Sequence, residues 1–172
     1  MKKSDFYYDL PEELIAQHPA EPRDSARLLV YHKNSGKIED KHFYDIIDYL
    51  RPGDVLVVND TKVIPARIYG YKDATGGKIE FLLHKRVDLT DWEVLAKPAR
   101  KALPGNNIRF SDKLYAEVLS CGEDGIRQVR FHFDGVFEDI LREIGEMPLP
   151  HYIHEKLEDD EQYQTVYARE SG

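Results

Sequence analysis

The sequence predicts an α/β domain that carries an inserted small β-barrel, because the pattern of residues changes twice along the chain. Helix-like and strand-like segments alternate over residues 1–61, and short strand-like runs with no helical pattern between them fill residues 62–134. A helical pattern returns in residues 135–172, which we assign to the α/β domain again.

Composition and charge limit the kind of protein that this can be. The 172 residues hold 41% apolar and 33% charged side chains, a mixture typical of soluble globular proteins. The single cysteine, Cys121, rules out a disulfide framework, and with no signal peptide or membrane-spanning window we expect a cytoplasmic protein. The net charge of −8 argues against a protein that coats nucleic acid nonspecifically, although a local basic face stays possible.

The first part of the chain begins with short elements. DFYYDL, residues 5–10, predicts a strand, and LPEELIAQ predicts a helix of one or two turns with Pro11 at its start and two glutamates in its first turn. After a polar segment, RLLVYHK and GKIEDKHF predict a hairpin around the turn NSG.

A helix and a buried strand complete this first part. In HFYDIIDYL the residues Phe43, Ile46, Ile47 and Leu50 recur at helical spacing, so we expect an amphipathic helix that ends at RPGD. VLVV, residues 55–58, is short and continuously apolar, which favours a strand buried on both faces.

Six short runs predict the barrel. They are VIPARIYG, GKIEFLLHK, DWEVLAKP, NNIRFSD, KLYAEVLS and GIRQVRFHF. In GVFEDILREIGEM, which follows, an apolar face from Val136 to Ile144 predicts a helix with Gly145 just past its end. QYQTVYA, near the end of the chain, is predicted to be extended.

Several familiar catalytic motifs are absent. The chain has no glycine-rich dinucleotide loop, no Walker A lysine loop, no HExxH and no CxxC pair. Its seven histidines are scattered, and the pair His151 and His154 lacks acidic ligands nearby, so we expect no metal site. Cys121 has no histidine or basic group beside it in the sequence, and we do not expect it to be a nucleophile.

Three polar segments hold the candidate functional residues, and the first is PAEPRDSARLLV. Arg23, Asp24 and Arg27 lie within five residues there, on a backbone restrained by two prolines. Two guanidinium groups so placed suit a carboxylate or a phosphate. An Arg–Asp ion pair that orders a loop explains the segment equally well.

The second segment is VVNDTKVIPARIYG. It places Asn59, Asp60 and Thr61 just past the carboxyl end of the predicted buried strand, where open α/β sheets bind ligands. These groups can bind ribose hydroxyls or amines, and Asp60 can act as a base, whereas a plain Asx turn also accounts for them. Arg67, on the first predicted barrel strand, faces either a phosphate or solvent.

The third segment is LAKPARKALPG, a basic turn of Lys97, Arg100 and Lys101 around Pro98. With other cations of the predicted barrel it could form a positive face on an acidic protein, and an ordinary solvated turn is the alternative. These features by themselves predict a two-domain protein with a polar site at the junction of its domains.

Six stretches, in this order, closely resemble the S-adenosylmethionine:tRNA ribosyltransferase-isomerase family of queuosine biosynthesis. They are DFYYDLPEELIAQHPAEPRDSARLLV, VVNDTKVIPARIYG, GGKIEFLL, WEVLAKPARKALPG, GEMPLPHYI and YQTVYA, and they run from about residue 4 to residue 168. The resemblance implies transfer of the ribosyl part of S-adenosylmethionine onto 7-aminomethyl-7-deazaguanine at the tRNA wobble position. The sugar is rearranged to give epoxyqueuosine, while adenine and methionine leave. The family fold is an α/β domain with an inserted β-barrel.

The resemblance also implies a role for the residues that would bind the co-substrate. S-adenosylmethionine donates the ribosyl group and carries a carboxylate, an ammonium group, a ribose and an adenine. We expect Arg23, Arg27, Asn59 and Thr61 to bind these groups, because they supply opposite charges and hydrogen-bonding partners from two segments that would line one cleft.

Catalysis and RNA binding are assigned in the same way. We expect the reaction to start with the removal of a proton beside the sulfonium, and a carboxylate can act as the base. We assign this base to Asp60 first and to Asp24 second. We expect Arg67, Lys97 and Arg100 to face the anticodon arm of the tRNA, and no metal to take part.

The chain departs from the family after YQTVYA. Family members continue through a stretch close to Ala-Pro-Thr-Ala-Gly-Leu-His-Phe into a second part of the α/β domain, whereas this sequence ends at RESG. We therefore expect a truncated N-terminal portion with an incomplete α/β domain, inactive on its own and monomeric. The alternative from another class is a noncatalytic module that binds RNA or a protein.

Overall fold

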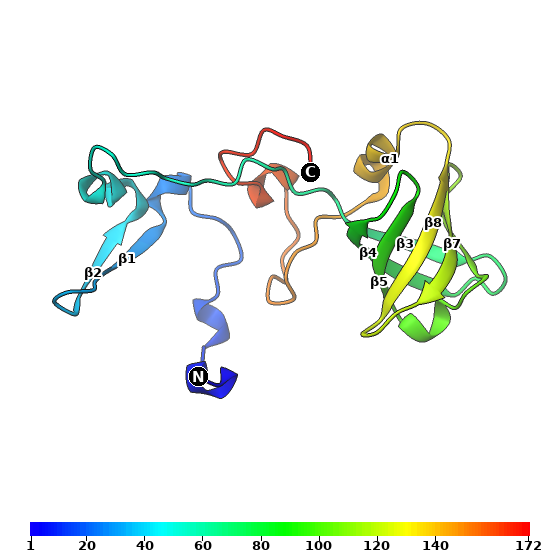
Figure 1. Cartoon of the computed structure of the whole chain (residues 1–172), viewed down its shortest axis with the longest axis horizontal. Helices are drawn as coiled ribbons and strands as arrows, with labels where there is room; N and C mark the ends of the chain where they lie inside the picture. Colours follow the sequence, from blue (N-terminus) through cyan, green and yellow to red (C-terminus); the bar gives the residue numbers. More distant parts are fainter. The chain divides into compact units, whose positions relative to one another are not determined.

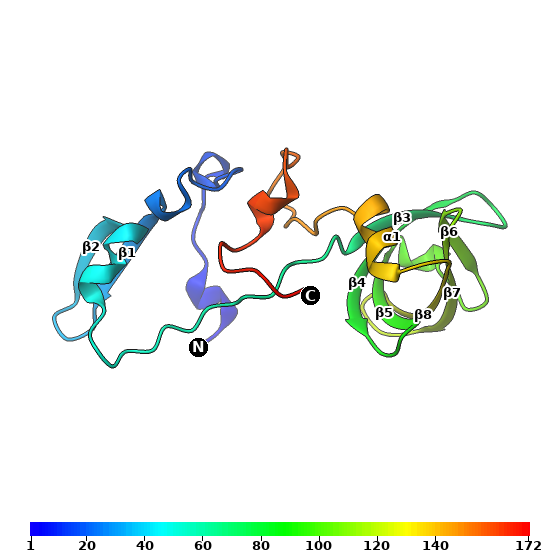
Figure 2. The ribbon, with the colours of Figure 1, turned by 90° about the horizontal axis from the view of Figure 1, so that it is seen from above.

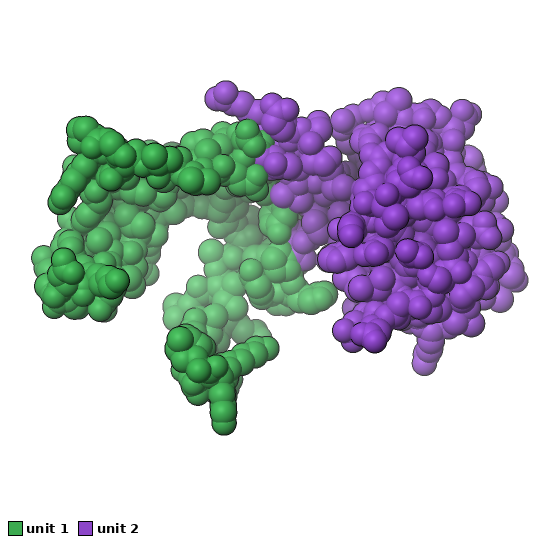
Figure 3. All heavy atoms as spheres, in the orientation of Figure 1, with its two compact units in different colours: residues 1–60, 150–168 green, residues 61–149, 169–172 purple.

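The computed structural model describes all residues, 1–172, and they form two compact units. Unit 1 comprises residues 1–60 and 150–168, and unit 2 comprises residues 61–149 and 169–172 (Figure 3). Every buried apolar side chain lies between Ala66 and Leu141, so the hydrophobic core belongs to unit 2 alone.

Unit 2 is built on a closed barrel of antiparallel strands in the order β3-β4-β5-β8-β7-β6. The strands are β3 (Arg67–Lys72), β4 (Lys78–Arg86), β5 (Asp91–Lys97), β6 (Asn107–Ser111), β7 (Leu114–Cys121) and β8 (Ile126–Phe133). Because β6 pairs back onto β3, the sheet has no free edge, and Figure 2 looks into the resulting ring. Each strand overlaps one of the six runs predicted from the sequence, and the predicted barrel is confirmed.

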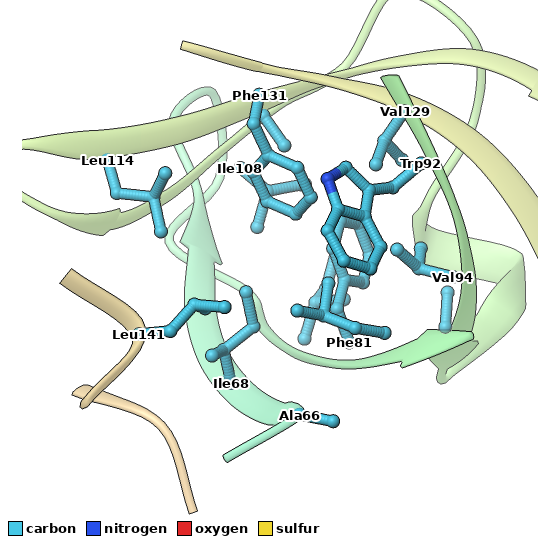
Figure 4. Packing of buried hydrophobic residues seen from close by; sticks show 14 of the residues in the cluster. Ala66, Ile68, Phe81, Trp92, Val94, Ile108, Leu114, Val129, Phe131 and Leu141 are labelled. Carbon is cyan, nitrogen blue, oxygen red and sulfur yellow. The ribbon is translucent and has the colours of Figure 1, made fainter. Parts of the chain in front are cut away.

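The barrel interior is filled by every second side chain of its strands, as the two-residue period of a strand requires. Phe81, Val94 and Phe131 are almost fully buried and point into this interior, where Trp92 packs beside them (Figure 4). Gly70 allows a close approach of two strands, since a β-carbon there would stand 2.7 Å from the Phe110 ring. The alternating apolar pattern of the sequence is therefore what closes the sheet around a single core.

Helix α1 (Phe137–Ile144) lies at one end of the barrel, and the turn η5 (Ala99–Lys101, light green) lies at the other (Figure 1). Phe137 is 2% exposed and its ring centroid is 5.1 Å from that of Phe131, so the helix extends the barrel core. Gly145 ends the helix as predicted, but with extended backbone (φ −85°). A small residue is needed there because a β-carbon would stand 2.3 Å from the carbonyl oxygen of Pro65.

Unit 1 consists of short elements. They are η1 (Lys3–Phe6), η2 (Glu12–Leu14), η3 (Arg23–Ser25), β1 (Arg27–His32), β2 (Lys37–His42), η4 (Phe43–Tyr49) and η6 (Asp160–Tyr163), where η denotes a 3₁₀ helix. Strands β1 and β2 form an antiparallel hairpin, which confirms the prediction for this part of the chain. QYQTVYA, predicted to be extended, begins inside η6 and forms no strand.

Two predicted strands of unit 1 are wrong. DFYYDL overlaps η1, and VLVV is an extended segment outside any sheet, with Val55 and Val57 86% and 87% exposed. The physical reason is the same for both: a strand forms only where a neighbouring strand accepts its backbone hydrogen bonds, and none pairs with these residues.

The helix predicted over HFYDIIDYL forms as the 3₁₀ helix η4, and its apolar face is not covered, since Ile47 is 72% exposed. The only α-helix of the chain is α1, and the predicted α/β domain therefore stays a prediction. None of the helices has the length and apolar character needed to cross a membrane.

One ion pair on the outer face of the barrel gives a test of its stability. Nε and Nη2 of Arg130 each lie 2.7 Å from a carboxylate oxygen of Asp91, and the hydrogen bond from Arg130 is the main reason why the pKa of Asp91 lies below its usual 3.8. A carboxylate with a depressed folded-state pKa stabilises the fold above its unfolded-state pKa, and this contribution is lost as the pH falls through the folded-state pKa.

We expect Asp91→Asn to lower the urea midpoint of the barrel at neutral pH, and we expect the difference from wild type to shrink below about pH 4. Urea titrations at several pH values measure both. Asp112→Asn, in the exposed β6–β7 turn, is the matched control and should follow the wild type throughout. A difference for Asp91→Asn that stays constant down to low pH would show that the ion pair is not its cause.

Candidate functional site

Unit 1 contains a groove of about 650 Å³ between residues 18–24, here called the arginine loop, and residues 159–168. It is lined by His18, Pro19, Glu21, Arg23, Asp159, Glu161, Gln162, Gln164, Thr165, Val166 and Ala168. The lining joins two stretches that are far apart in the sequence. Residues 18–24 lie in a motif that carries the family resemblance, and residues 163–168 of the second stretch form another.

Arg23 connects the two walls of the groove. Its Nη1 donates a hydrogen bond to the carbonyl oxygen of Gln162 at 2.9 Å, and its Nη2 donates one to that of Gln164 at 3.2 Å. Gln164 is only 6% exposed. These contacts hold residues 162–164 against the arginine loop through backbone carbonyls, and the role of Arg23 in binding the co-substrate stays a prediction.

Polar residues around the start of the arginine loop also contact residues 152–155. The side-chain amide of Gln17 donates to the carbonyl oxygen of Tyr152 at 3.0 Å and accepts from the backbone N–H of His154 at 2.7 Å. His18 Nε2 lies 2.6 Å from a carboxylate oxygen of Glu155. Sequence reasoning missed Gln17 and His18, and the signal available was their place beside Pro19 in a motif of the resemblance.

Asp24 and Arg27 are not among the residues that line the groove. Asp24 is exposed within η3, and Arg27 begins β1 with its side chain 87% exposed. Arg27 Nη2 lies 4.0 Å from a carboxylate oxygen of Asp40, and an exposed ion pair of this length contributes little to stability. The predicted cluster of two arginines and an aspartate is thus divided, and only Arg23 reaches the groove.

The second predicted segment meets the groove through Asn59. The hydroxyl of Thr165, which lines the groove, donates a hydrogen bond to the carbonyl oxygen of Asn59 at 3.0 Å. Asp60 follows directly and is exposed. Thr61 belongs to unit 2, where it forms a parallel bridge with Glu170. The structure therefore attaches Arg23 and Asn59 to one short stretch, residues 162–165.

Arg67 is held against the barrel. Its side chain is 19% exposed, its Nε lies 3.6 Å from a carboxylate oxygen of Glu80, and its Nη2 donates to the carbonyl oxygen of Leu149 at 3.3 Å. Burial, together with the charges of Glu146 and Glu80, raises the pKa of the nearby Tyr69. Lys97 and Arg100 are exposed, and Lys97 lies opposite Glu80 in the β4–β5 register.

The basic turn that carries Arg100 is fixed by a residue that sequence reasoning missed. Arg127 is 7% exposed, and it donates to the carbonyl oxygens of Ala102 at 2.6 Å, Ile126 at 2.7 Å and Ala99 at 2.7 Å. The signal was present in the sequence, because Arg127 stands two residues before Val129 and shares its inward-facing register on β8.

No group of three or more histidine, cysteine, aspartate or glutamate side chains is placed to hold a metal ion. The side chains that line the groove offer carboxylates, amides and a guanidinium group. Such groups can bind a charged nucleoside and move a proton.

A family model described as "Queuosine biosynthesis protein" matches residues 3–172. The chain belongs to this family. Its membership confirms the resemblance inferred from the motifs, and it covers both units, so the groove and the barrel are both parts of a queuosine biosynthesis protein.

Two relatives are similar to this chain over about half of their own length. A curated protein of Acetivibrio thermocellus, named S-adenosylmethionine:tRNA ribosyltransferase-isomerase, is 57% identical over 173 residues, which are 100% of this chain and 51% of the relative. A crystal structure of an S-adenosylmethionine tRNA ribosyltransferase from Thermotoga maritima is 46% identical and covers 74% of this chain and 44% of that one, with a TM-score of 0.36. The chain spans about half the length of the curated relative that it matches.

Proposed function

We propose that this chain is part of a tRNA-modifying enzyme that transfers and isomerises the ribosyl group of S-adenosylmethionine. The acceptor is 7-aminomethyl-7-deazaguanine at the tRNA wobble position, and the products are epoxyqueuosine in the tRNA, adenine and methionine. Membership of the queuosine biosynthesis family and the name of the Acetivibrio thermocellus relative support this proposal. The cytoplasmic location, the monomeric state and the inactivity of the chain on its own remain predictions.

The observation that carries the proposal is the attachment of both predicted segments to residues 162–165. Arg23 binds the carbonyl oxygens of Gln162 and Gln164, and the carbonyl oxygen of Asn59 accepts from Thr165. The arginine loop and the segment Asn59–Asp60 thus contact the same stretch, which a shared ligand site in unit 1 would need. In this proposal Arg23, Arg27 and Asn59 bind the co-substrate, and Arg23 also holds the groove.

Charge favours unit 1 as the place for S-adenosylmethionine, whose sulfonium and ammonium groups are positive. Unit 1 contains 9 lysines and arginines against 17 aspartates and glutamates, whereas unit 2 contains 15 of each, so the net charge of −8 falls entirely in unit 1. Carboxylates of Glu21, Asp159 and Glu161 line the groove. A negative potential of this kind attracts a cationic substrate and repels RNA.

Asp60 is the proposed base. A proton on a carbon beside the sulfonium is acidified by the positive sulfur, and a carboxylate can remove it once the substrate is held in place. Asp60 directly follows the residue that Thr165 holds, and its side chain is exposed and accessible to a substrate. Asp24 is the second choice.

The test uses a chimera in which residues 1–172 replace the matched half of the Acetivibrio thermocellus relative. We expect Asp60→Asn to lower the turnover of modified tRNA by about 100-fold or more, because general acid–base catalysis contributes 10²- to 10⁴-fold. Mass spectrometry of nucleosides from the digested tRNA measures the product. Asp48→Asn, which removes an exposed carboxylate of η4, is the matched control and should leave turnover unchanged.

Unchanged turnover in Asp60→Asn would remove Asp60 from the mechanism, and the same measurement on Asp24→Asn would then test the second choice. A chimera that binds tRNA but has no affinity for S-adenosylmethionine would instead favour the noncatalytic binding module.

A further inference from the structure

The 15 lysines and arginines of unit 2 differ in what surrounds them. Six lie within ion-pair distance of a carboxylate, in the pairs Arg67–Glu80, Arg86–Glu138, Arg109–Asp73, Lys113–Glu143, Arg130–Asp91 and Arg142–Asp139. Lys78, Lys97, Arg100 and Lys101 are exposed and have no carboxylate at that distance. All four belong to the same end of the barrel, at η5 and the start of β4.

The four cations lie on neighbouring segments of unit 2, the start of β4, the end of β5 and η5. The ammonium group of Lys101 lies 3.6 Å from the position that a β-carbon on Gly77 would take, and Gly77 directly precedes Lys78. Lys78 Nζ lies 4.5 Å from the centre of the Tyr69 ring. In the β4–β5 register Lys97 lies opposite Glu80, which is two residues after Lys78 on β4. We call these four residues, Lys78, Lys97, Arg100 and Lys101, the basic rim.

The backbone of the rim is held in place before any partner arrives. The guanidinium group of Arg127 binds the carbonyl oxygens of Ala99 and Ala102, which stand on either side of Arg100 and Lys101. A backbone fixed in this way loses little further freedom when a partner binds, which favours affinity. Glu123 and Asp124, in the adjacent β7–β8 turn, limit the rim on one side.

We propose that the basic rim binds the phosphate backbone of RNA, and that Lys78 and Lys101 contribute to this binding beside Lys97 and Arg100. The cations are spread over an open surface, an arrangement that suits phosphates repeated along a chain better than one small enclosed anion. Because unit 2 is neutral overall, four unpaired cations at one end give that end a local positive potential. The identity of the RNA as tRNA rests on the proposed function.

Fluorescence anisotropy of a labelled tRNA transcript, titrated with the 172-residue chain from about 50 to about 200 mM salt, tests the proposal. We expect Lys78→Ala and Lys101→Ala each to weaken binding several-fold and to reduce the slope of log affinity against log salt by about 1. Lys85→Ala is the matched control, since Lys85 is an exposed lysine near the other end of the same strand, and it should keep the wild-type slope. Circular dichroism confirms that each variant is folded.

Three results would contradict the proposal that the basic rim binds RNA. They are no binding of the transcript by the wild-type chain at low salt, wild-type binding by both rim variants, and an equal loss in Lys85→Ala. An acidic protein would become the preferred partner if the rim variants bound tRNA normally. Turnover by the chimera is a separate measurement. RNA binding by the rim can therefore be disproved while the proposed ribosyl transfer stands, and ribosyl transfer can be disproved while RNA binding stands.

Discussion

Deuterium labelling of the 172-residue chain is expected to leave the amide hydrogens of the barrel strands protected long after those of unit 1 have exchanged. The reason is the distribution of buried apolar surface, which stabilises folded proteins by about 25 cal/mol per Å². Side chains such as Phe81 and Val129 are 0% exposed in unit 2, whereas unit 1 contains no buried apolar residue and leaves Leu29 and Ile47 65% and 72% exposed. Exchange in unit 1 therefore needs only local opening, which costs little.

The measurement is hydrogen exchange followed by mass spectrometry of peptides. Peptides from β4, β5, β7 and β8 should exchange through global unfolding of the barrel, and the β1–β2 hairpin serves as an internal comparison, because its backbone hydrogen bonds are formed without a core beneath them. Equal protection of the hairpin and the barrel would show that unit 1 has a stability that its burial does not explain.

Replacement of Arg127 by methionine is expected to destabilise the barrel by about 2–4 kcal/mol. Methionine has a similar length and fills much of the same space, but it donates no hydrogen bonds. The carbonyl oxygen of Ala102 would then lose its hydrogen bond from Arg127, and that of Ala99 would keep only the backbone N–H of Ala102. A buried polar group that loses its partner costs about 1–3 kcal/mol. Urea unfolding followed by fluorescence of Trp92, which is 8% exposed in the core, measures the change.

Arg130→Met is the matched control for this prediction. It makes the same substitution on the same strand, three residues away, but at an exposed position whose ion pair with Asp91 is open to solvent. Its effect should be much smaller. If Arg127→Met proved as stable as the wild type, or if the two variants lost the same stability, the carbonyl contacts of Arg127 would not be what holds the η5 turn.

The barrel could be predicted from the sequence because its signal is local. Each strand shows the two-residue alternation in its own few residues, and the β3–β4, β5–β6 and β7–β8 connections contain glycine or proline. The hairpin of β1 and β2 was predictable for the same reason, since its turn and both strands lie within residues 27–42.

The failures concern elements that depend on distant partners. Residues 55–58 have the composition of a buried strand, yet no strand pairs with them and they remain exposed. The apolar spacing of Phe43 to Leu50 is that of an α-helix, but its face packs on no core, and the segment forms a 3₁₀ helix. Composition shows what a segment can do, and its neighbours decide whether it does so.

The candidate site was predictable only in part. The motifs named the two segments that reach the groove, but the acceptors of Arg23 are backbone carbonyls, which side-chain chemistry cannot reveal in a sequence. The contact between Thr165 and Asn59 spans 106 residues, and no local pattern indicates it. Arg127 could have been found, because it is a charged residue in an inward-facing register of β8.

Ribosyl transfer is the central claim, and the chimera with the remaining half of the Acetivibrio thermocellus relative tests it most directly. The measurement is the transfer of label from S-adenosylmethionine labelled in its ribose to tRNA that carries 7-aminomethyl-7-deazaguanine. The predicted result is label in an epoxyqueuosine nucleoside, with adenine and methionine released in equal amounts. Label that stays in S-adenosylmethionine, while a wild-type relative of the same length transfers it, would contradict the proposed function of this chain.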